Sequence, residues 1–140
     1  MEKRATIYRK RSEILKNTLY ALIAFITVLL IALSYQQHLT NLCKEINVKS
    51  NSIILSIENS EYSETEKELS ELKNIWENNF KILMAFQDHS SVNDAGVFLT
   101  LAINCFRTEE YNQVSDNLIS FTEIVNELAS ENMPYIENIL

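Results

Sequence analysis

The hydrophobic pattern of the chain is dominated by one apolar run near its start, which extends from Leu19 to Leu33. The run holds no Gly, Pro or charged residue, and only Thr27 and the hydroxyl of Tyr20 add polar groups to it. Together with its flanking residues the run is about 18 residues long, close to the roughly 17–25 that cross a bilayer core as a helix. Because every peptide group in hydrocarbon has to be hydrogen-bonded within its own segment, we expect one transmembrane helix over residues 17–35.

Beyond this run the apolar positions recur at offsets of three, four and seven, which is the spacing of one face of an α-helix. The pattern passes from the apolar run to about Ser60 without a turn signal, and it restarts after Ser63, Ser91 and Tyr111. Ser63 and Ser91 each stand three residues before an acid, which indicates helix N-caps. One Gly and one Pro in 140 residues also favour helix throughout. The sequence therefore predicts an all-α protein, in which the transmembrane helix continues into an up-down four-helix domain.

The second helix of this domain has two distinct faces. Its outer, solvated face is expected to include Glu66, Glu68 and Glu71. Aromatic side chains at helical spacing are mostly core residues, although Trp76 and Phe80 are candidates for a binding surface if they are exposed. The predicted inward positions are Leu69, Leu72, Ile75, Trp76, Phe80, Leu83 and Phe86.

An internal repeat organises the domain. Shifting the chain by about 49 residues places the first two helices on the last two, so that Glu61-Tyr62 falls on Glu110-Tyr111. We interpret residues 36–88 and 91–131 as two stacked helical hairpins, which resemble tetratricopeptide-like repeats. The tail, residues 132–140, is too apolar for a free end, so we expect it to pack back on the domain.

Charge is distributed unevenly between the two sides of the apolar run. Residues 1–16 carry six Lys or Arg against two Glu, whereas the chain from Gln36 onward carries six basic and seventeen acidic residues. Short basic flanks stay in the cytoplasm, which predicts a single-pass protein of the cell membrane with residues 1–16 as a basic cytoplasmic tail and residues 36–140 as an extracytoplasmic domain. An acidic domain there is not attracted to nucleic acid.

The apolar run also has features of a signal peptide. Ala32-Leu33-Ser34 fits a cleavage site, and the basic leader fits an export signal, so cleavage after Ser34 is the alternative to a membrane anchor. The run is longer than the usual apolar core of a signal peptide, roughly 7–15 residues, and no helix breaker precedes the site. These features favour an uncleaved anchor.

The two cysteines, Cys43 and Cys105, would lie in a compartment that permits disulfides. In the predicted topology their helices are parallel, and the two positions are offset by roughly 20 Å along the helix axis. A disulfide needs Cα atoms within about 7 Å, so we expect two free thiols.

Asp88-His89 is the pair of residues that is best suited to metal binding or catalysis. An imidazole near Asp88 can titrate or bind a metal. With no second His nearby and no Cys spacing, the simpler interpretation is that His89 caps the end of one helix and that Asp88 or Ser91 bonds loop amides. The sequence has no Gly-rich phosphate loop, no Gly-x-Ser-x-Gly and no metalloprotease helix motif. We therefore expect no enzyme activity, no cofactor and no metal site, with Asp88 and His89 as weak metal candidates.

From Ile57 onward the chain resembles family 4363 of the domains of unknown function, a group of short single-pass bacterial membrane proteins. The residues that carry the resemblance are Trp76, Phe86-x-Asp88-His89, Tyr111 and Asn138-Ile139-Leu140. Acidic residues often follow the histidine in that family, whereas Ser90-Ser91 stand here. The resemblance implies a membrane location and a helical domain, and it implies no activity.

The predicted function is a non-catalytic extracytoplasmic interaction or accessory module. Its partners would be the lipid bilayer and another membrane or extracytoplasmic protein, or a second copy of the chain, contacted through Trp76, Phe80, Ile139 and Leu140. The alternative is a small metal- or proton-sensing or hydrolytic protein centred on Asp88-His89.

Overall fold

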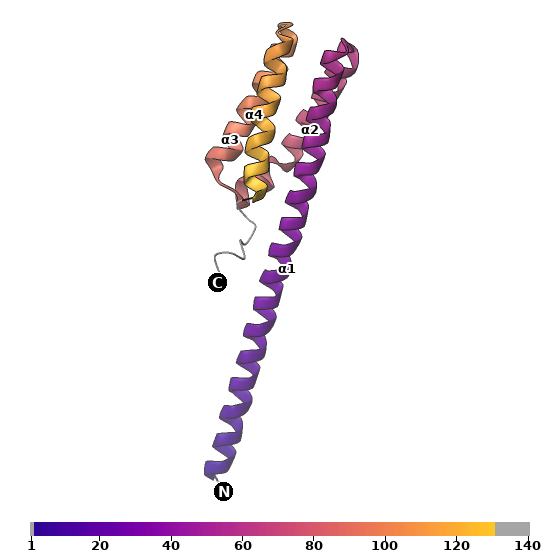
Figure 1. The fold of residues 1–140 in the computed structure, drawn as a ribbon. Coiled ribbons are helices and arrows are strands. Elements are labelled where there is room, and N and C mark those ends of the chain that lie inside the picture. The colour runs from indigo at the N-terminus through magenta and orange to yellow at the C-terminus, as the bar shows by residue number, and fades with distance from the viewer. Residues whose placement is uncertain (1, 131–140) are drawn as a thin grey trace, which may run out of the picture. The chain divides into compact units, whose positions relative to one another are not determined.

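The computed structural model describes the backbone of residues 2–130 and the side chains of residues 15–130. Within this part the chain forms four helices and no strand, which confirms the all-α prediction (Figure 1). The helices are α1 (Glu2–Glu58), α2 (Tyr62–Phe86), α3 (His89–Arg107) and α4 (Tyr111–Ser130). The chain divides into two compact units, one up to His38 and one from Leu39 onward, and the division falls inside α1.

The first unit, up to His38, contains the apolar part of α1. From Leu15 onward this helix is long and apolar enough to cross a membrane, and an 18-residue stretch of it has a mean hydropathy of 2.2. The hydroxyl of Thr27 donates to the carbonyl of Ile23 (2.9 Å), so its polar atom is satisfied within the helix. A membrane anchor and a signal sequence share this length and composition. The large side chains exposed here are Leu15, Leu19, Tyr20, Leu22, Ile23, Phe25, Ile26, Val28, Leu29, Leu30, Ile31 and Leu33.

The second unit has its own hydrophobic core, to which all four helices contribute. Along each helix the buried positions follow the three- and four-residue spacing that the sequence shows, because that spacing brings side chains to one face. Phe86 departs from its predicted inward position, since it lies in the last turn of α2 and is 55% exposed. The side chains with no exposed surface include Ile46, Ile53, Leu72, Val92, Ala95, Val114, Leu118 and Phe121.

Polar contacts join α1 to α2. Glu68 accepts hydrogen bonds from the hydroxyls of Ser52 and Ser56 and is only 8% exposed. The prediction that Glu68 belongs to the solvated face is therefore wrong, because these two hydroxyls replace water around its carboxylate. Beside it Lys49 pairs with Glu71, and this hydrogen bond raises the pKa of Lys49 and lowers the pKa of Glu71.

Polar contacts also join α1 to α4. The thiol of Cys43 donates to the carbonyl of Val125 (3.3 Å), and the amide of Asn47 donates to Asn126 Oδ1 (2.7 Å). Cys43 is buried and Cys105 is half-buried, and both are free thiols, as predicted. Burial raises the pKa of Cys43 to about 11.

Two corners of the same geometry connect α1 to α2 and α3 to α4. Each contains one residue in the left-handed region, Ser60 (φ 62°) and Glu109 (φ 63°), and the two are equivalent positions of the sequence repeat. At each corner the next residue donates its N–H to the carbonyl five positions earlier (2.8 and 2.9 Å), and the left-handed residue donates to the carbonyl three positions earlier (2.9 and 3.1 Å). This is the Schellman arrangement, which satisfies the last carbonyls of a helix. The backbone therefore follows the sequence repeat at both corners.

The corners also bring the starts of α2 and α4 together. Tyr62 and Tyr111, the first residues of these helices, stack with ring centroids 4.4 Å apart and 14° between the ring planes. Phe106, at the end of α3, lies 5.8 Å from Tyr111 between ring centroids. Partial burial is the main cause that raises the pKa of the Tyr111 phenol.

The predicted N-caps are displaced by two or three positions. Helix α2 begins at Tyr62 with Glu61 in the capping position, so Ser63 already lies inside the helix. Helix α3 begins at His89 with Asp88 as its N-cap, so Ser91 lies in its first turn. At the first corner the left-handed residue has already redirected the chain, which leaves no separate turn before Ser63.

Candidate functional site

Asp88 has a structural role at the start of α3. Its Oδ2 accepts a hydrogen bond from the N–H of Ser91 (2.8 Å) and another from the hydroxyl of Ser91 (3.0 Å). The backbone hydrogen bond is the main cause that lowers the pKa of Asp88. This arrangement matches the interpretation of Asp88 as a residue that bonds a backbone amide, because an N-cap carboxylate satisfies an N–H at the helix start.

His89 is the first residue of α3 and is exposed. It does not cap the end of α2, contrary to the prediction, because the chain has already turned into the next helix at Asp88. Among the described side chains, residues 15–130, no three His, Cys, Asp or Glu groups come close enough to hold a metal ion. The structure thus places Asp88 and His89 next to each other without a third ligand from this region.

Trp76 is a core residue of the second unit, with 4% of its surface exposed. Its ring packs edge-to-face on Phe121 (centroids 5.3 Å apart) and on Phe80 (6.4 Å). A Cβ atom at Gly96 would lie 3.2 Å from Trp76 Nε1, so the single glycine of the chain allows α3 to approach the indole. Trp76 therefore contacts the protein interior, and a partner cannot reach most of its surface.

Phe80 is half-buried and lies at the edge of a shallow apolar hollow between α2 and α3. Val97 and Leu101 of α3 line the same hollow and are 54% and 42% exposed. Of the predicted interaction residues, Phe80 is thus the one that the structure leaves accessible. Ile139 and Leu140 lie outside the described residues.

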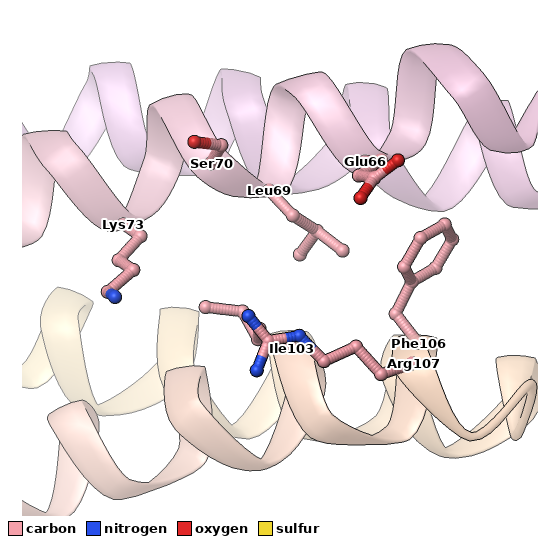
Figure 2. Close-up of a pocket in the computed structure, with 7 residues that line it drawn as sticks. All are labelled: Glu66, Leu69, Ser70, Lys73, Ile103, Phe106 and Arg107. Carbon is pink, nitrogen blue, oxygen red and sulfur yellow. The ribbon is translucent and has the colours of Figure 1, made fainter.

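A second hollow between the same two helices combines apolar and charged side chains, and we call it the α2–α3 groove (Figure 2). Its volume is about 220 Å³. The groove is lined by Glu66, Leu69, Ser70 and Lys73 from α2 and by Ile103, Phe106 and Arg107 from α3. Figure 2 shows Leu69 and Lys73 of α2 extending toward α3, with Leu69 opposite Ile103 and Phe106.

Arg107 is the residue of this groove that sequence reasoning missed. Within residues 15–130, no hydrogen bond or ion pair joins its guanidinium to another side chain, whereas Lys73 pairs with Glu77 (3.5 Å). The sequence offered one signal for Arg107, which is that it is the only arginine after Arg11. It could not identify the groove, since Leu69 and Arg107 are far apart in the sequence and meet only through packing of α2 on α3.

Comparison with known proteins identifies one family. Residues 33–139 match the family described as a domain of unknown function, DUF4363. No curated protein and no solved structure matches the chain. The matched region begins at the end of the apolar run and includes α2, α3 and α4. Because it covers more than half of the sequence, the chain belongs to the DUF4363 family, as the residues around Trp76, Asp88-His89 and Tyr111 indicated.

Proposed function

We propose that this protein is a membrane-tethered helical interaction module without catalytic activity. Residues 17–35 span the cell membrane once, residues 1–16 remain in the cytoplasm, and residues 36–140 form the extracytoplasmic domain. The observation that carries the proposal is the change of environment along α1. The large apolar side chains between Leu15 and Leu33 are exposed, whereas from Leu39 onward one face of the helix is buried in a helical core.

The exposed stretch supports a lipid environment. Transfer of one large apolar side chain out of water stabilises by about 1.5–3 kcal/mol, and twelve such side chains between Leu15 and Leu33 are about half-exposed or more. In water this surface would far exceed the few hundred Å² of contiguous apolar patch that soluble monomers tolerate. A bilayer covers it without any further protein.

The second unit supports a stack of two helical hairpins, similar to tetratricopeptide-like repeats. The two left-handed corners are separated by the length of one repeat, and the starts of α2 and α4 meet through Tyr62 and Tyr111. Stacks of helical hairpins commonly bind other proteins along a groove. The α2–α3 groove and the hollow beside Phe80 are accessible apolar surfaces that fit such a role.

The charge of the second unit narrows the class of partner. Residues 39–130 hold six basic and fifteen acidic side chains, a net charge of −9. Such a surface repels nucleic acid and anionic lipid headgroups, which favours another membrane or extracytoplasmic protein as the partner. A second copy of the chain carries the same net charge, so self-association would depend on the apolar surfaces instead.

The orientation can be tested with a C-terminally tagged full-length chain. We expect it to remain in the membrane fraction after alkaline washing, and we expect protease added to intact cells to digest residues beyond Gln36. A matched variant, Ile26→Lys with Leu29→Lys, should leave the membrane fraction, because each central Lys costs about 2.5–3.5 kcal/mol in a transmembrane helix. Digestion only after the cells are opened would contradict the proposed orientation.

The same protein distinguishes the anchor from a cleaved signal peptide. The intact mass of the purified chain should correspond to a sequence that retains residues 17–35. A mass that corresponds to a start after Ser34 would show cleavage, and the exported helical unit would then not be tethered by this helix.

A further inference from the structure

The two hollows between α2 and α3 lie along one side of these helices. Glu66, Lys73 and Phe80 line them from α2 and stand seven residues apart, which is two helical turns, so they share one side of α2. Thr100 and Arg107 have the same spacing on α3. We call the strip formed by the residues that line both hollows the α2–α3 face. Besides Phe80, the hollow at its far end is lined by Asn93, Gly96, Val97, Thr100 and Leu101.

Along this face α2 and α3 run in opposite directions. Arg107 of α3 lines the groove with Glu66 of α2, whereas Gly96 of α3 meets Trp76 of α2. A later position on α2 thus faces an earlier position on α3. Glu66 and Arg107 therefore lie at the same level, at one end of the face (Figure 2).

The α2–α3 face has no excess of negative charge, although the unit that carries it has a net charge of −9. Helix α3 has no charged residue between Asp94 and Arg107, and Val97 and Leu101 of this stretch are exposed. Repulsion between two acidic units is screened beyond about 8–10 Å at physiological salt, so the charges close to a contact decide whether two copies can approach there. At this face a second copy meets apolar side chains and a nearly balanced set of charges.

Two of these charges have no partner in the same molecule. Within residues 15–130, neither Glu66 nor Arg107 forms an ion pair or a side-chain hydrogen bond. Both side chains are exposed, and their charges are opposite. A surface that holds one unpaired carboxylate and one unpaired guanidinium can be complementary to itself, since a guanidinium binds a carboxylate with two parallel hydrogen bonds.

We propose that a second copy of the chain packs on the α2–α3 face about a two-fold axis parallel to α2 and α3. This rotation keeps every residue at its own level and places α2 of each copy on α3 of the other. Glu66 of each copy then meets Arg107 of the second copy, which gives two ion pairs. At the other end, Phe80 of each copy meets Val97 and Leu101 of the second copy, which covers the exposed apolar side chains.

The direction of the axis suits two chains in one membrane. Because the rotation leaves levels along the axis unchanged, Leu39, where the second unit begins, lies at the same end of the dimer in both copies. Two chains that are tethered in the same orientation require this. The inference therefore rests on the proposed tether and deepens the proposed function, since it names the partner of one accessible surface.

The size of the face predicts a weak dimer. It extends over fourteen residues of α2, about 21 Å, and two adjacent helices are about 20 Å wide. Each copy would bury roughly 400 Å², half of the ~800 Å² that a partner buries in a standard interface. We therefore expect dissociation in dilute detergent and pairing in a bilayer, where confinement of the anchors raises the effective concentration.

The test is a photo-crosslink in the full-length protein in phosphatidylcholine vesicles. Benzoylphenylalanine in place of Val97 should give a covalent dimer through the peptide Asn74–Lys81, and mixed ¹⁵N-labelled and unlabelled chains should show that the crosslink joins two molecules. The same group in place of Val48, which is 70% exposed on α1, is the matched control and should leave monomers. Crosslinks within one molecule only, no crosslink, or equal amounts of dimer from both positions would each overturn the proposal.

A charge exchange between copies tests the two ion pairs. Glu66→Arg and Arg107→Glu should each lower the yield of the Val97 crosslink about fivefold, because both pairs across the axis become repulsive. When the two variants are mixed, the yield should recover, because opposite charges again meet at both pairs. Lys44→Glu makes the same charge change as Arg107→Glu on an exposed position of α1 and should leave the yield unaltered. A mixture that does not recover, or an equal loss with Lys44→Glu, would contradict the pairing.

The tether and the dimer can fail separately. Flotation of the vesicles measures whether the chain is anchored, and the crosslink measures whether two copies meet. Floated protein without a covalent dimer would refute only the dimer. A covalent dimer from protein that does not float would refute only the tether, and protein that neither floats nor crosslinks would refute both.

Discussion

Tyr62 and Tyr111 stack ring on ring across the starts of α2 and α4, with their centroids 4.4 Å apart. The two residues occupy equivalent positions, each two places after a left-handed residue, Ser60 or Glu109. The contact therefore joins the starts of α2 and α4 through residues that follow the two corners at the same distance.

The first prediction concerns this contact. Tyr62→Leu and Tyr111→Leu should each destabilise the protein, and the double variant should lose less than the sum, because the stacking is lost only once. Chemical unfolding of the full chain in micelles, followed by the fluorescence of the single Trp76, measures the coupling. Tyr62→Leu combined with Asn112→Ala, an exposed neighbour without a ring, should be additive. A coupling near zero for the tyrosine pair would contradict the prediction.

The second prediction concerns the left-handed corners. Ser60→Gly should raise the free energy of unfolding by about 1 kcal/mol, because glycine adopts a positive φ without the clash between Cβ and the backbone. Glu109→Gly should act in the same direction. Ser70→Gly makes the same change at an exposed position inside α2 and should lower stability by about 0.5–1 kcal/mol. Destabilisation by Ser60→Gly would indicate that its side chain has a role that the structure does not show.

The third prediction concerns the buried carboxylate of α2. Glu68→Ala should lower the free energy of unfolding by about 1–3 kcal/mol, because the hydroxyls of Ser52 and Ser56 lose their acceptor in a buried position. Glu66→Ala removes the same group from the exposed face of the same helix and should change stability by no more than about 0.5 kcal/mol. An equal loss of stability in Glu68→Ala and Glu66→Ala would mean that the carboxylate of Glu68 is solvated.

The fourth prediction concerns Asp88 and its dependence on pH. Asp88→Ala should lower the midpoint of thermal unfolding by several degrees, because α3 loses its N-cap. The pKa of Asp88 is lowered, so its contribution is present above the ordinary value of 3.8 and is lost as the pH falls through the lower folded-state pKa. The difference between the two proteins should therefore shrink in strong acid. His89→Ala, at the exposed neighbouring position, should have little effect at any pH, and a large effect would revive a role for this histidine.

The fifth prediction concerns the two thiols. With a pKa of about 11 instead of 9, Cys43 has about a hundredfold less thiolate at pH 8, and it is also buried. A maleimide should therefore label Cys105 and leave Cys43 unmodified in the folded chain, as peptide mapping can show. Because the pKa of Cys43 is raised, the stability that its neutral form contributes is present below pH 9 and is lost as the pH rises toward 11. Cys43→Ala should not show this loss, and rapid labelling of Cys43 would contradict its burial.

Local signals in the sequence predicted most of the fold. The helical spacing and the scarcity of Gly and Pro indicated four helices, and the internal repeat located both corners at Glu61-Tyr62 and Glu110-Tyr111. Helix ends were less accurate. Ser63 fits a capping pattern, but α2 already begins at Tyr62, after Glu61, which makes no side-chain capping hydrogen bond. At the start of α3, Asp88 and not Ser91 occupies the N-cap position. Its carboxylate accepts a hydrogen bond from the N–H of Ser91.

The groove could not be predicted from one sequence, since it depends on which helices meet. Leu69 lies on α2 and Arg107 lies on α3, and the two helices approach each other where Gly96 meets Trp76. Glu68 was misplaced for a related reason. Its spacing resembles that of a solvated face, and only the hydroxyls of Ser52 and Ser56, on the preceding helix, make its burial possible.

The matched corners also determine how such a chain can change in length. Since the backbone has the same conformation at Ser60 and at Glu109, deletion of residues 59–107 would join Glu58 to Thr108 and recreate a complete corner. A duplication of the same segment would likewise add one corner with its flanking helices. Insertions or deletions of other sizes would rotate the following helix away from its partners, so natural relatives of different length should differ by whole repeats.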